Sequence, residues 1–210
     1  GVDSYPTQVS NLLQDLCGRG IYGGKGLYHI AAFQQALEGR VPDNALLSHD
    51  LLEGAFAGAA LVGDVAVYDG FPATLSGYLR RLHRWTRGDW QLLPFILGQN
   101  GLDGLSRFLM LDNLARSLCP AAALWTLVLS LWAGWLPGLL CALIYPFLPV
   151  LSALPLPSWG AVRRGIAQLA LLPALAVTQA DAAARALYRM KVSHKNLLEW
   201  TPAAEADRQG

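Results

Sequence analysis

One long interval without charged residues constrains this chain more than any other feature of its sequence. From Ser117 to Val162 there are 46 residues and no Asp, Glu, Lys or Arg. A membrane-spanning helix needs about 20 mostly apolar residues, so two of them fit into this interval. Pro137 divides it and predicts a hairpin of two spans, Leu118–Leu136 and Gly138–Leu156. The alternative is the core of a soluble protein, but soluble domains seldom avoid charge over such a length.

The basic residues around this interval predict its orientation. Arg116 precedes it, and Arg163 and Arg164 follow it. Because basic residues favour the cytoplasmic side, both ends of the hairpin are expected in the cytoplasm. The next apolar segment, Gly165–Ala180, is short, contains one proline and two glutamines, and precedes a basic tail. We interpret it as an interfacial or bundle-packed helix. A third span is the alternative, and it would place the basic tail on the wrong side.

Charge and cysteine content argue against two other classes of protein. The formal net charge is +1, which gives no reason to expect nucleic acid as a partner. The three cysteines form no Cys-x-x-Cys motif, and two of them lie in the apolar interval. Neither a disulfide framework nor a zinc site is therefore predicted.

The polar part, residues 1 to about 110, has a mixed pattern. The stretch HIAAFQQALEG predicts a helix that Gly39 ends, and a second helix is expected to begin at Asp50. The stretch LVGDVAVYDGFP alternates apolar and polar residues and predicts a strand. A helix with a basic side follows from Thr74 to Trp85. The chain has no run of βαβ units and no Asp-x-Asp, so we expect it to be a fragment of a larger domain.

Two short motifs in this part are candidates for a site. GGKGLY predicts a tight loop where the backbone of Gly24, Lys25 and Gly26 comes close to a ligand, with an ordinary turn as the alternative. SHDLLEG places Asp50 at the beginning of a helix, where a carboxylate can serve as a general base. The alternative is a plain helix cap, since Asp50 and Glu53 have the spacing of a capping box.

A third motif, HRWTRGDW, combines arginines and tryptophans shortly before the apolar interval. The guanidinium groups of Arg84 and Arg87 suit bidentate binding of phosphate. The ring of Trp85 offers a flat apolar face for the face of a sugar. A basic helix on the membrane surface, with tryptophan at the interface, explains the same spacing equally well.

The order of these motifs resembles the processive membrane-bound glycosyltransferases with a GT-A fold, such as cellulose and hyaluronan synthases. In those enzymes a T-E-D motif supplies the catalytic aspartate, and a Q-x-x-R-W motif holds the donor pyrophosphate and stacks the acceptor sugar. Here the first motif reads Ser48-His49-Asp50, and the second begins with Arg81 and ends with Trp85. His49 replaces the glutamate and Arg81 replaces the glutamine.

Three longer blocks look like cyclic β-1,2-glucan synthases: GKGLYHIAAFQQALEGRVPDNALLSHDLLEG, RRLHRWTRGDWQLLP and YRMKVSHKNLLEWTPAAEA. The resemblance implies an α/β fold with membrane helices. Residues 1–110 would be the C-terminal half of a GT-A-like glycosyltransferase domain. Residues 111–160 would be the transmembrane helical pair, and residues 161–210 an interfacial or third membrane helix with a linker. A phosphorylase-like region of the same polypeptide would follow.

The resemblance also implies a chemistry and a location. The protein would transfer glucose from UDP-glucose, with inversion, to a growing β-glucan chain. It would be a multi-pass protein of a bacterial inner membrane with its catalytic part in the cytoplasm. A divalent cation, Mg²⁺ or Mn²⁺, is expected, bound by the N-terminal half of the domain that carries the Asp-x-Asp.

Each candidate residue takes a role from this resemblance. Asp50 would be the base, and Arg84, with Arg87 or Arg81, would neutralise the leaving diphosphate. Trp85 would stack the acceptor sugar. The wall of the acceptor pocket would be formed by Gly24, Lys25 and Gly26. Asp89 would pair with Arg87, and the supporting residues would be His49, Glu53, Asp89 and Trp90.

Other functions remain open from the sequence. The chain could be only a structural membrane anchor of a larger enzyme, or part of a different processive β-glycan synthase. A small transporter is a further alternative. Transport paths usually contain a charged residue, however, and the two predicted spans contain none.

Overall fold

The computed structural model describes residues 10–42, 44–47, 50–65, 70–148 and 159–199. Helices make up most of this part of the chain. They are α1 (Ser10–Cys17), α2 (Ile30–Leu37), α3 (Asp50–Ala57), α4 (Leu75–Gln91), α5 (Leu93–Leu97), α6 (Gly104–Ala133), α7 (Leu136–Ile144), α9 (Trp159–Ala170) and α10 (Leu172–Tyr188). A 3₁₀ turn, η2 (Tyr145–Phe147), and a π-helical turn, η3 (Arg189–Ser193), complete the elements.

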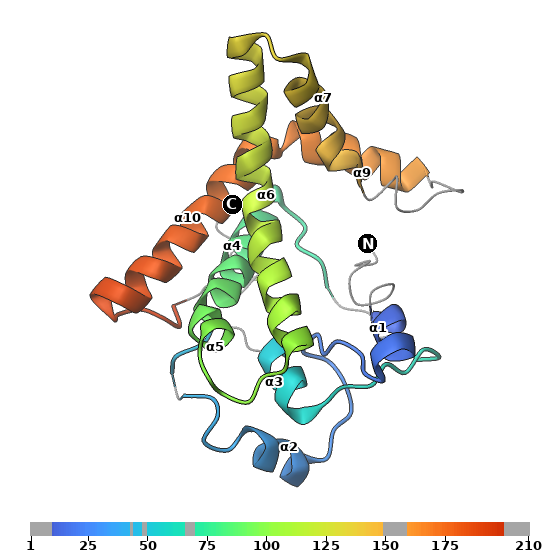
Figure 1. The fold of residues 1–210 in the computed structure, drawn as a ribbon, viewed down its shortest axis with the longest axis vertical. Helices are drawn as coiled ribbons and strands as arrows, with labels where there is room; N and C mark the ends of the chain where they lie inside the picture. The colour runs from blue at the N-terminus through green and yellow to red at the C-terminus, as the bar shows by residue number, and fades with distance from the viewer. Residues whose placement is uncertain (1–9, 43, 48–49, 66–69, 149–158, 200–210) are drawn as a thin grey trace.

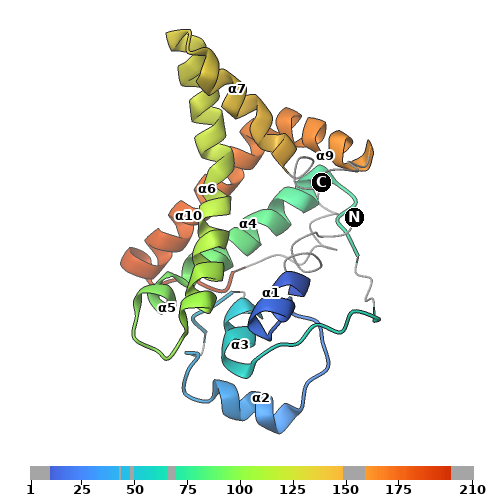
Figure 2. The ribbon, with the colours of Figure 1, turned by 45° about the vertical axis from the view of Figure 1, so that its right-hand side comes forward.

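Helix α6 is the axis of the molecule (Figure 1). Helices α4 and α10 pack against each other and against α6. The short helices α1, α2 and α3 lie around the N-terminal end of α6, and α7 turns back beside its C-terminal end. The view in Figure 2 shows the same arrangement after a rotation of 45°. The polar helices therefore gather at one end of α6, and its apolar end extends beyond them.

Local sequence signals account for the ends of α6. The Oδ1 atom of Asp103 accepts a hydrogen bond from the backbone N–H of Ser106 at 2.7 Å, which caps the first turn. Gly134 ends the helix in the left-handed conformation, with φ at 65°. The 30 residues between them have a length of about 45 Å at the usual rise per residue. Of the helices described, α6 alone is long and apolar enough to cross a membrane by itself.

The predicted pair of spans has a more complex outcome. The first span, Leu118–Leu136, falls on the second half of α6, although the helix begins earlier and stops at Ala133. After it, the apolar helical segment Leu136–Phe147 has only 12 residues, too few for a span of about 20. The rest of the second predicted span lies largely outside the described residues, so the hairpin stays a prediction.

The sequence suggested a single helix for the segment Gly165–Ala180, but the structure divides it into two. Helix α9 ends at Ala170, and the axes of the two helical parts differ by 69°. Pro173 lies in the first turn of α10, where its missing N–H costs no hydrogen bond but breaks continuity with α9. Helix α10 then packs along α4 and α6 through small buried residues such as Ala182 and Ala186.

The α/β fold class is wrong for the part of the chain that the structure describes. No strand occurs there, so a GT-A-like α/β fold is not supported. The strand predicted over residues 61–72 lies partly outside that part, at residues 66–69, and its described ends form no strand. Around Leu61 the extended backbone pairs with a side chain: Gln14 donates from Nε2 to the Leu61 carbonyl at 3.0 Å and accepts from its N–H. Next to it, Gly20 N–H donates to the Ala59 carbonyl at 2.7 Å. A strand needs a neighbouring strand along its length, and an alternating pattern alone does not supply one.

The core joins the short helices to α6. Leu52 of α3 and Met110 of α6 are almost completely buried in it. Its other buried members are Leu46, Leu92, Ile96, Leu102 and Leu114. This packing fixes α3, and the aspartate at its beginning, against the long helix.

Candidate functional site

Asp50 is the first residue of α3 and is half-buried. The apolar residue Leu52, two positions later, has an exposed fraction of 0% and anchors the first turn of α3 in the core. This anchor fixes the position of Asp50. Gly24 lies against the carboxylate: a Cβ atom on Gly24 would be 2.6 Å from Asp50 Oδ2. Gly24 also has φ at 78°, a conformation that favours glycine. The glycine-rich loop thus brings its backbone to the predicted base.

The rest of this loop lies along α3. A Cβ atom on Gly54 would be 2.6 Å from Tyr22 Cβ, so the two segments touch. Burial raises the pKa of Tyr22, and the nearby charges of Glu53 and Asp50 raise it further. Sequence reasoning missed Tyr22, because nothing in its local pattern distinguishes it from any other loop tyrosine.

The remaining loop candidates are more peripheral. Gly26 faces the Tyr22 ring, with 3.5 Å from an added Cβ to its Cε2. Lys25 is exposed. The prediction for His49 falls on a residue outside those that the structure describes.

Helix α4 carries the arginine–tryptophan motif. The Oγ1 atom of Thr74 caps the helix by accepting from Gly77 N–H at 3.0 Å, a role in which threonine is favoured. Arg84 is half-buried, and burial is the main cause that lowers its pKa. Arg81 lowers that pKa further and the Asp50 carboxylate raises it. Asp50 thus lies against Gly24 and acts electrostatically on Arg84.

Trp85 and Arg81 contact each other on one side of α4. The guanidinium carbon of Arg81 is 4.2 Å from the centroid of the Trp85 ring, a cation–π geometry between residues one helical turn apart. Arg81 Nη1 also donates to the Gly70 carbonyl at 3.1 Å. Trp85 remains 40% exposed, so a second partner can reach the indole.

Three residues that follow Trp85 in the motif form hydrogen bonds with other segments of the fold. Arg87 donates a hydrogen bond to the carbonyl of Glu199. Asp89 accepts one from Asn113 Nδ2 at 3.4 Å, and Trp90 donates from Nε1 to Ser117 Oγ at 2.9 Å. The predicted pair of Asp89 with Arg87 is therefore not the one in the structure.

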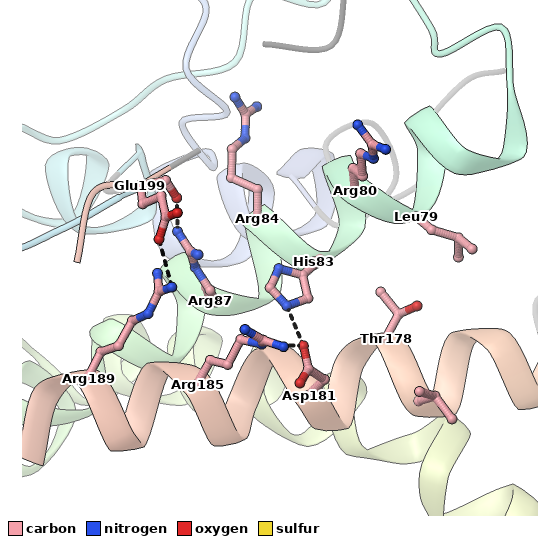
Figure 3. A pocket seen from close by; sticks show the side chains of 11 residues that line it. Leu79, Arg80, His83, Arg84, Arg87, Thr178, Asp181, Arg185, Arg189 and Glu199 are labelled. Atoms are coloured by element: carbon pink, nitrogen blue, oxygen red, sulfur yellow. Dashed lines mark hydrogen bonds and ion pairs between the residues drawn. The ribbon is translucent and has the colours of Figure 1, made fainter. Parts of the chain in front are cut away.

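The three arginines of the predicted diphosphate clamp do not converge. Arg81 lies over Trp85, and Arg87 reaches the segment around residue 199. Arg84 points to the side of α4 away from α10 (Figure 3). Of the three, Arg84 has Asp50 as an electrostatic neighbour.

Asp89 has the most strongly altered carboxyl group near the site. Burial raises its pKa from 3.8 to about 7. The hydrogen bond from Asn113 acts in the opposite direction, and the charge of Asp50 adds to the rise. A carboxyl group with this pKa changes its protonation state near neutral pH.

Gln91, at the end of α4, joins three segments and was also missed. Its Oε1 atom accepts from the backbone N–H of Leu47 at 2.7 Å, and its Nε2 donates to the carbonyl of Leu197 at 3.0 Å. With an exposed fraction of 2%, Gln91 is shielded from water. It fixes the backbone three residues before Asp50 to the helix that carries Arg84.

A pocket of about 500 Å³ lies between α4 and α10 (Figure 3). Within its lining, His83 Nε2 lies 3.0 Å from Asp181 Oδ2, and Arg185 Nε donates to the same oxygen at 2.6 Å. Its lining residues are Leu79, Arg80, His83, Arg84, Arg87, Val177, Thr178, Asp181, Arg185, Arg189 and Glu199. The sequence separates the two helices by about a hundred residues, so no local pattern could indicate this pocket.

The described residues do not fit a metal site of their own. No group of three or more His, Cys, Asp or Glu side chains lies close enough together there to hold an ion. No step of a reaction is therefore assigned to a metal held by these residues.

Comparison with known proteins gives one clear relationship. No family model matches the chain. The chain is 41% identical, over 239 aligned positions that cover all of it, to the cyclic beta-(1,2)-glucan synthase NdvB of Rhizobium meliloti (strain 1021). It spans 8% of the length of that relative. The resemblance to cyclic β-1,2-glucan synthases is thus confirmed for this chain as a segment that corresponds to a small part of such a protein.

Proposed function

We propose that this chain is part of a membrane-bound glucosyltransferase that builds β-1,2-glucan from UDP-glucose. The observation that carries the proposal is the close approach of Gly24 to the Asp50 carboxylate, which also acts electrostatically on Arg84; the three residues come from separate segments. A carboxylate beside a cation, with a glycine backbone closing in on it, suits transfer of a sugar from an anionic leaving group. The relationship to a cyclic β-(1,2)-glucan synthase supports β-1,2-glucan as the product.

Asp50 is the general base of this proposal. A hydroxyl oxygen of the acceptor glucose attacks the anomeric carbon of the donor while the bond from that carbon to the diphosphate oxygen breaks. The hydroxyl proton passes to an Asp50 carboxylate oxygen, and the bonding electrons leave with UDP. General base catalysis of this kind contributes typically 10²–10⁴-fold to a rate.

Arg84 supports departure of the diphosphate. Its guanidinium neutralises negative charge that grows on the leaving oxygen, and its half-buried position strengthens that interaction relative to bulk water. Trp85 is 40% exposed next to Arg84 and provides an apolar face for the acceptor sugar. We assign Arg81 to the support of Trp85, because its guanidinium covers part of the indole.

Helix α6 supports a position of the site at a membrane. The second half of this helix exposes large apolar side chains, among them Trp125, Leu129 and Trp132. The first half carries Arg107 and Arg116 and packs with the polar helices. We infer that the second half lies in the bilayer and that the site lies at its cytoplasmic surface. A reporter enzyme fused after residue 210 of this segment should be active in the cytoplasm, and an active periplasmic reporter there would reverse the orientation.

Asp50→Asn in the full-length protein tests the function. We expect glucan synthesis to fall by about 10²–10⁴-fold, since the amide cannot accept the proton. Binding of UDP-glucose should persist, because Asp50 makes no donor contact in the proposal. Asp64→Asn is the matched control, since Asp64 is an exposed carboxylate in a turn. Near-normal synthesis by Asp50→Asn would refute the assignment.

A structural role is the second candidate, and one observation favours it. Two side chains of the motif hydrogen-bond to other segments of the fold: Arg87 donates to the Glu199 carbonyl, and Trp90 donates to Ser117 Oγ. Substitutions that act through structure would lower the amount of folded protein together with activity. Measuring synthesis per folded protein therefore separates the two functions.

A further inference from the structure

Within the part of the chain that the structure describes, Arg87 is a buried cation without an ion pair of its own. Its exposed fraction is 6%, and its hydrogen bond to the Glu199 carbonyl involves a neutral acceptor. Among the described residues, its Nε–H has no acceptor. Burial of a charged group is costly unless an opposite charge and hydrogen bonds compensate for it. Binding of an anion next to Arg87 would therefore compensate its buried charge.

The carboxylates of the pocket already have other partners. Asp181 binds Arg185 at 2.6 Å and His83 at 3.0 Å. The Glu199 carboxylate binds Arg189 Nη2 at 2.7 Å. Because both carboxylates are paired with other groups, neither forms an ion pair with Arg87. In agreement with this, burial lowers the pKa of Arg87, and Arg189 lowers it further, against the opposite effect of Glu199.

The pocket between α4 and α10 gives an anion room to reach Arg87. Its volume of about 500 Å³ falls in the usual range for small-molecule sites, about 300–1,000 Å³. Five arginines and two carboxylates are among its lining residues. A phosphate group suits such a lining, because guanidinium groups bind its oxygens in pairs.

We propose that the part of this pocket lined by Arg87 of α4, Arg185 of α10 and Arg189 of η3 binds the phosphate group of a ligand other than the sugar donor. Arg84 lines the pocket as well, so this site adjoins the proposed place of transfer but uses other arginines. In Figure 3, Arg84 points away from α10, whereas Arg87 points toward the segment around Glu199 that Arg189 also binds. The volume leaves space for the group to which the phosphate is attached.

Two sources can deliver such a phosphate. One is the headgroup of an anionic lipid, since α10 packs along α6, the helix long enough to cross a membrane. The other is a soluble phosphorylated molecule. The recognition chemistry is the same in both cases.

The test measures binding of inorganic phosphate by isothermal titration to the full-length protein in nanodiscs of phosphatidylcholine alone. We expect saturable binding, and the double variant Arg185→Gln/Arg189→Gln should weaken it about tenfold or more, because each lost hydrogen bond to a charged group has an effect of that size. Arg163→Gln/Arg164→Gln is the matched control. It makes the same change in charge at two exposed arginines of α9 and should leave binding unchanged.

A second pair of measurements identifies the source and guards against misfolding. Arg185→Lys/Arg189→Lys keeps both charges and should lose less affinity than the glutamine variant. If phosphatidylglycerol in the nanodisc weakens binding of inorganic phosphate, the lipid headgroup is the ligand. If it has no effect, the ligand is soluble.

Three outcomes would overturn the proposal. One is the absence of phosphate binding in nanodiscs of phosphatidylcholine alone. Another is equal loss of affinity in the control pair of α9. The third is complete competition by UDP together with loss of UDP inhibition in Arg185→Gln/Arg189→Gln, which would make the pocket part of the donor site. The proposed transfer function is tested separately, because Asp50→Asn should bind phosphate normally.

Discussion

The proposed site has two halves that are held in place by different forces. Gly24 and Asp50 belong to the layer of loops and short helices, which Leu52 anchors in the core and in which side chains such as Gln14 and Gln91 hydrogen-bond to backbone groups. Arg84 and Trp85 belong to α4, which packs along α10 and α6. A few hydrogen bonds can be lost without unfolding the long helices, whereas loss of helix packing affects the whole molecule. Substitutions in the first half should therefore change activity more than stability.

This comparison predicts the largest effect at Gly24. Gly24→Ala places a methyl group 2.6 Å from Asp50 Oδ2 and imposes a φ of 78° on alanine. We expect synthesis to fall at least about 10²-fold, as displacements of roughly 1 Å at catalytic groups do, with little change in melting temperature. Gly23→Ala is the control, since a Cβ there meets no atom within 4 Å. Equal activity of the two variants would mean that the loop does not position Asp50.

The second prediction compares two neighbours within the helical half. Arg84→Ala should weaken inhibition by UDP about 10- to 100-fold, because a hydrogen bond between charged groups contributes about 1.5–3 kcal/mol. Trp85→Ala should spare UDP inhibition and shorten the product, and Trp85→Phe should restore part of its length. Both quantities are measured per amount of folded protein. Loss of UDP inhibition in Trp85→Ala alone would exchange the two roles.

Gln91 connects the two halves, so its replacement should affect both activity and stability. Gln91→Leu leaves the Leu47 N–H and the Leu197 carbonyl without their partner. Each unsatisfied buried group lowers the free energy of unfolding by about 1–3 kcal/mol. Synthesis per folded protein should fall as well, since the backbone before Asp50 is released.

Two further variants show whether Gln91 acts on the site. Gln91→Glu retains an acceptor for Leu47, so it should recover kcat more at low pH, where a protonated carboxyl can also donate to Leu197. Gln99→Leu, at an exposed glutamine, is the control. A loss of stability in Gln91→Leu with unchanged kcat per folded protein would reduce the residue to a structural role.

The smallest effect on synthesis is expected at Asp89, where the change concerns the pH dependence of stability. Its folded-state pKa is about 7 against 3.8 without burial, so the folded state keeps a proton that the unfolded state has lost. Stability should therefore fall as pH rises from about 4 to about 7, by at most about 4 kcal/mol at 1.36 kcal/mol per pKa unit. Asp89→Asn should remove this slope and raise the melting temperature at pH 8 but not at pH 4. An unchanged slope, as expected for the exposed control Asp15→Asn, would contradict the burial of a protonated Asp89.

Local signals in the sequence predicted much of the helical structure. Gly39 lies just beyond the end of α2 with φ at 69°, and α3 begins at Asp50. The apolar composition after Arg116 predicted the helix that is long enough for a membrane. Such features depend on backbone preferences and side-chain hydrophobicity within a few turns of chain, so sequence alone determines them.

Tertiary structure decided the pairing of segments that are distant in sequence. The alternating pattern around Leu61 predicted a strand, but the partner of that backbone is the side chain of Gln14. The spacing of Arg81, Arg84 and Arg87 predicted one clamp, but the packing of α4 between the loop layer and α10 gives each arginine a different environment. Likewise, Gln91 and the pocket beside α10 gave no local signal. The physical reason is that a side chain's partner depends on which surfaces meet when helices pack, and that is a property of the whole chain.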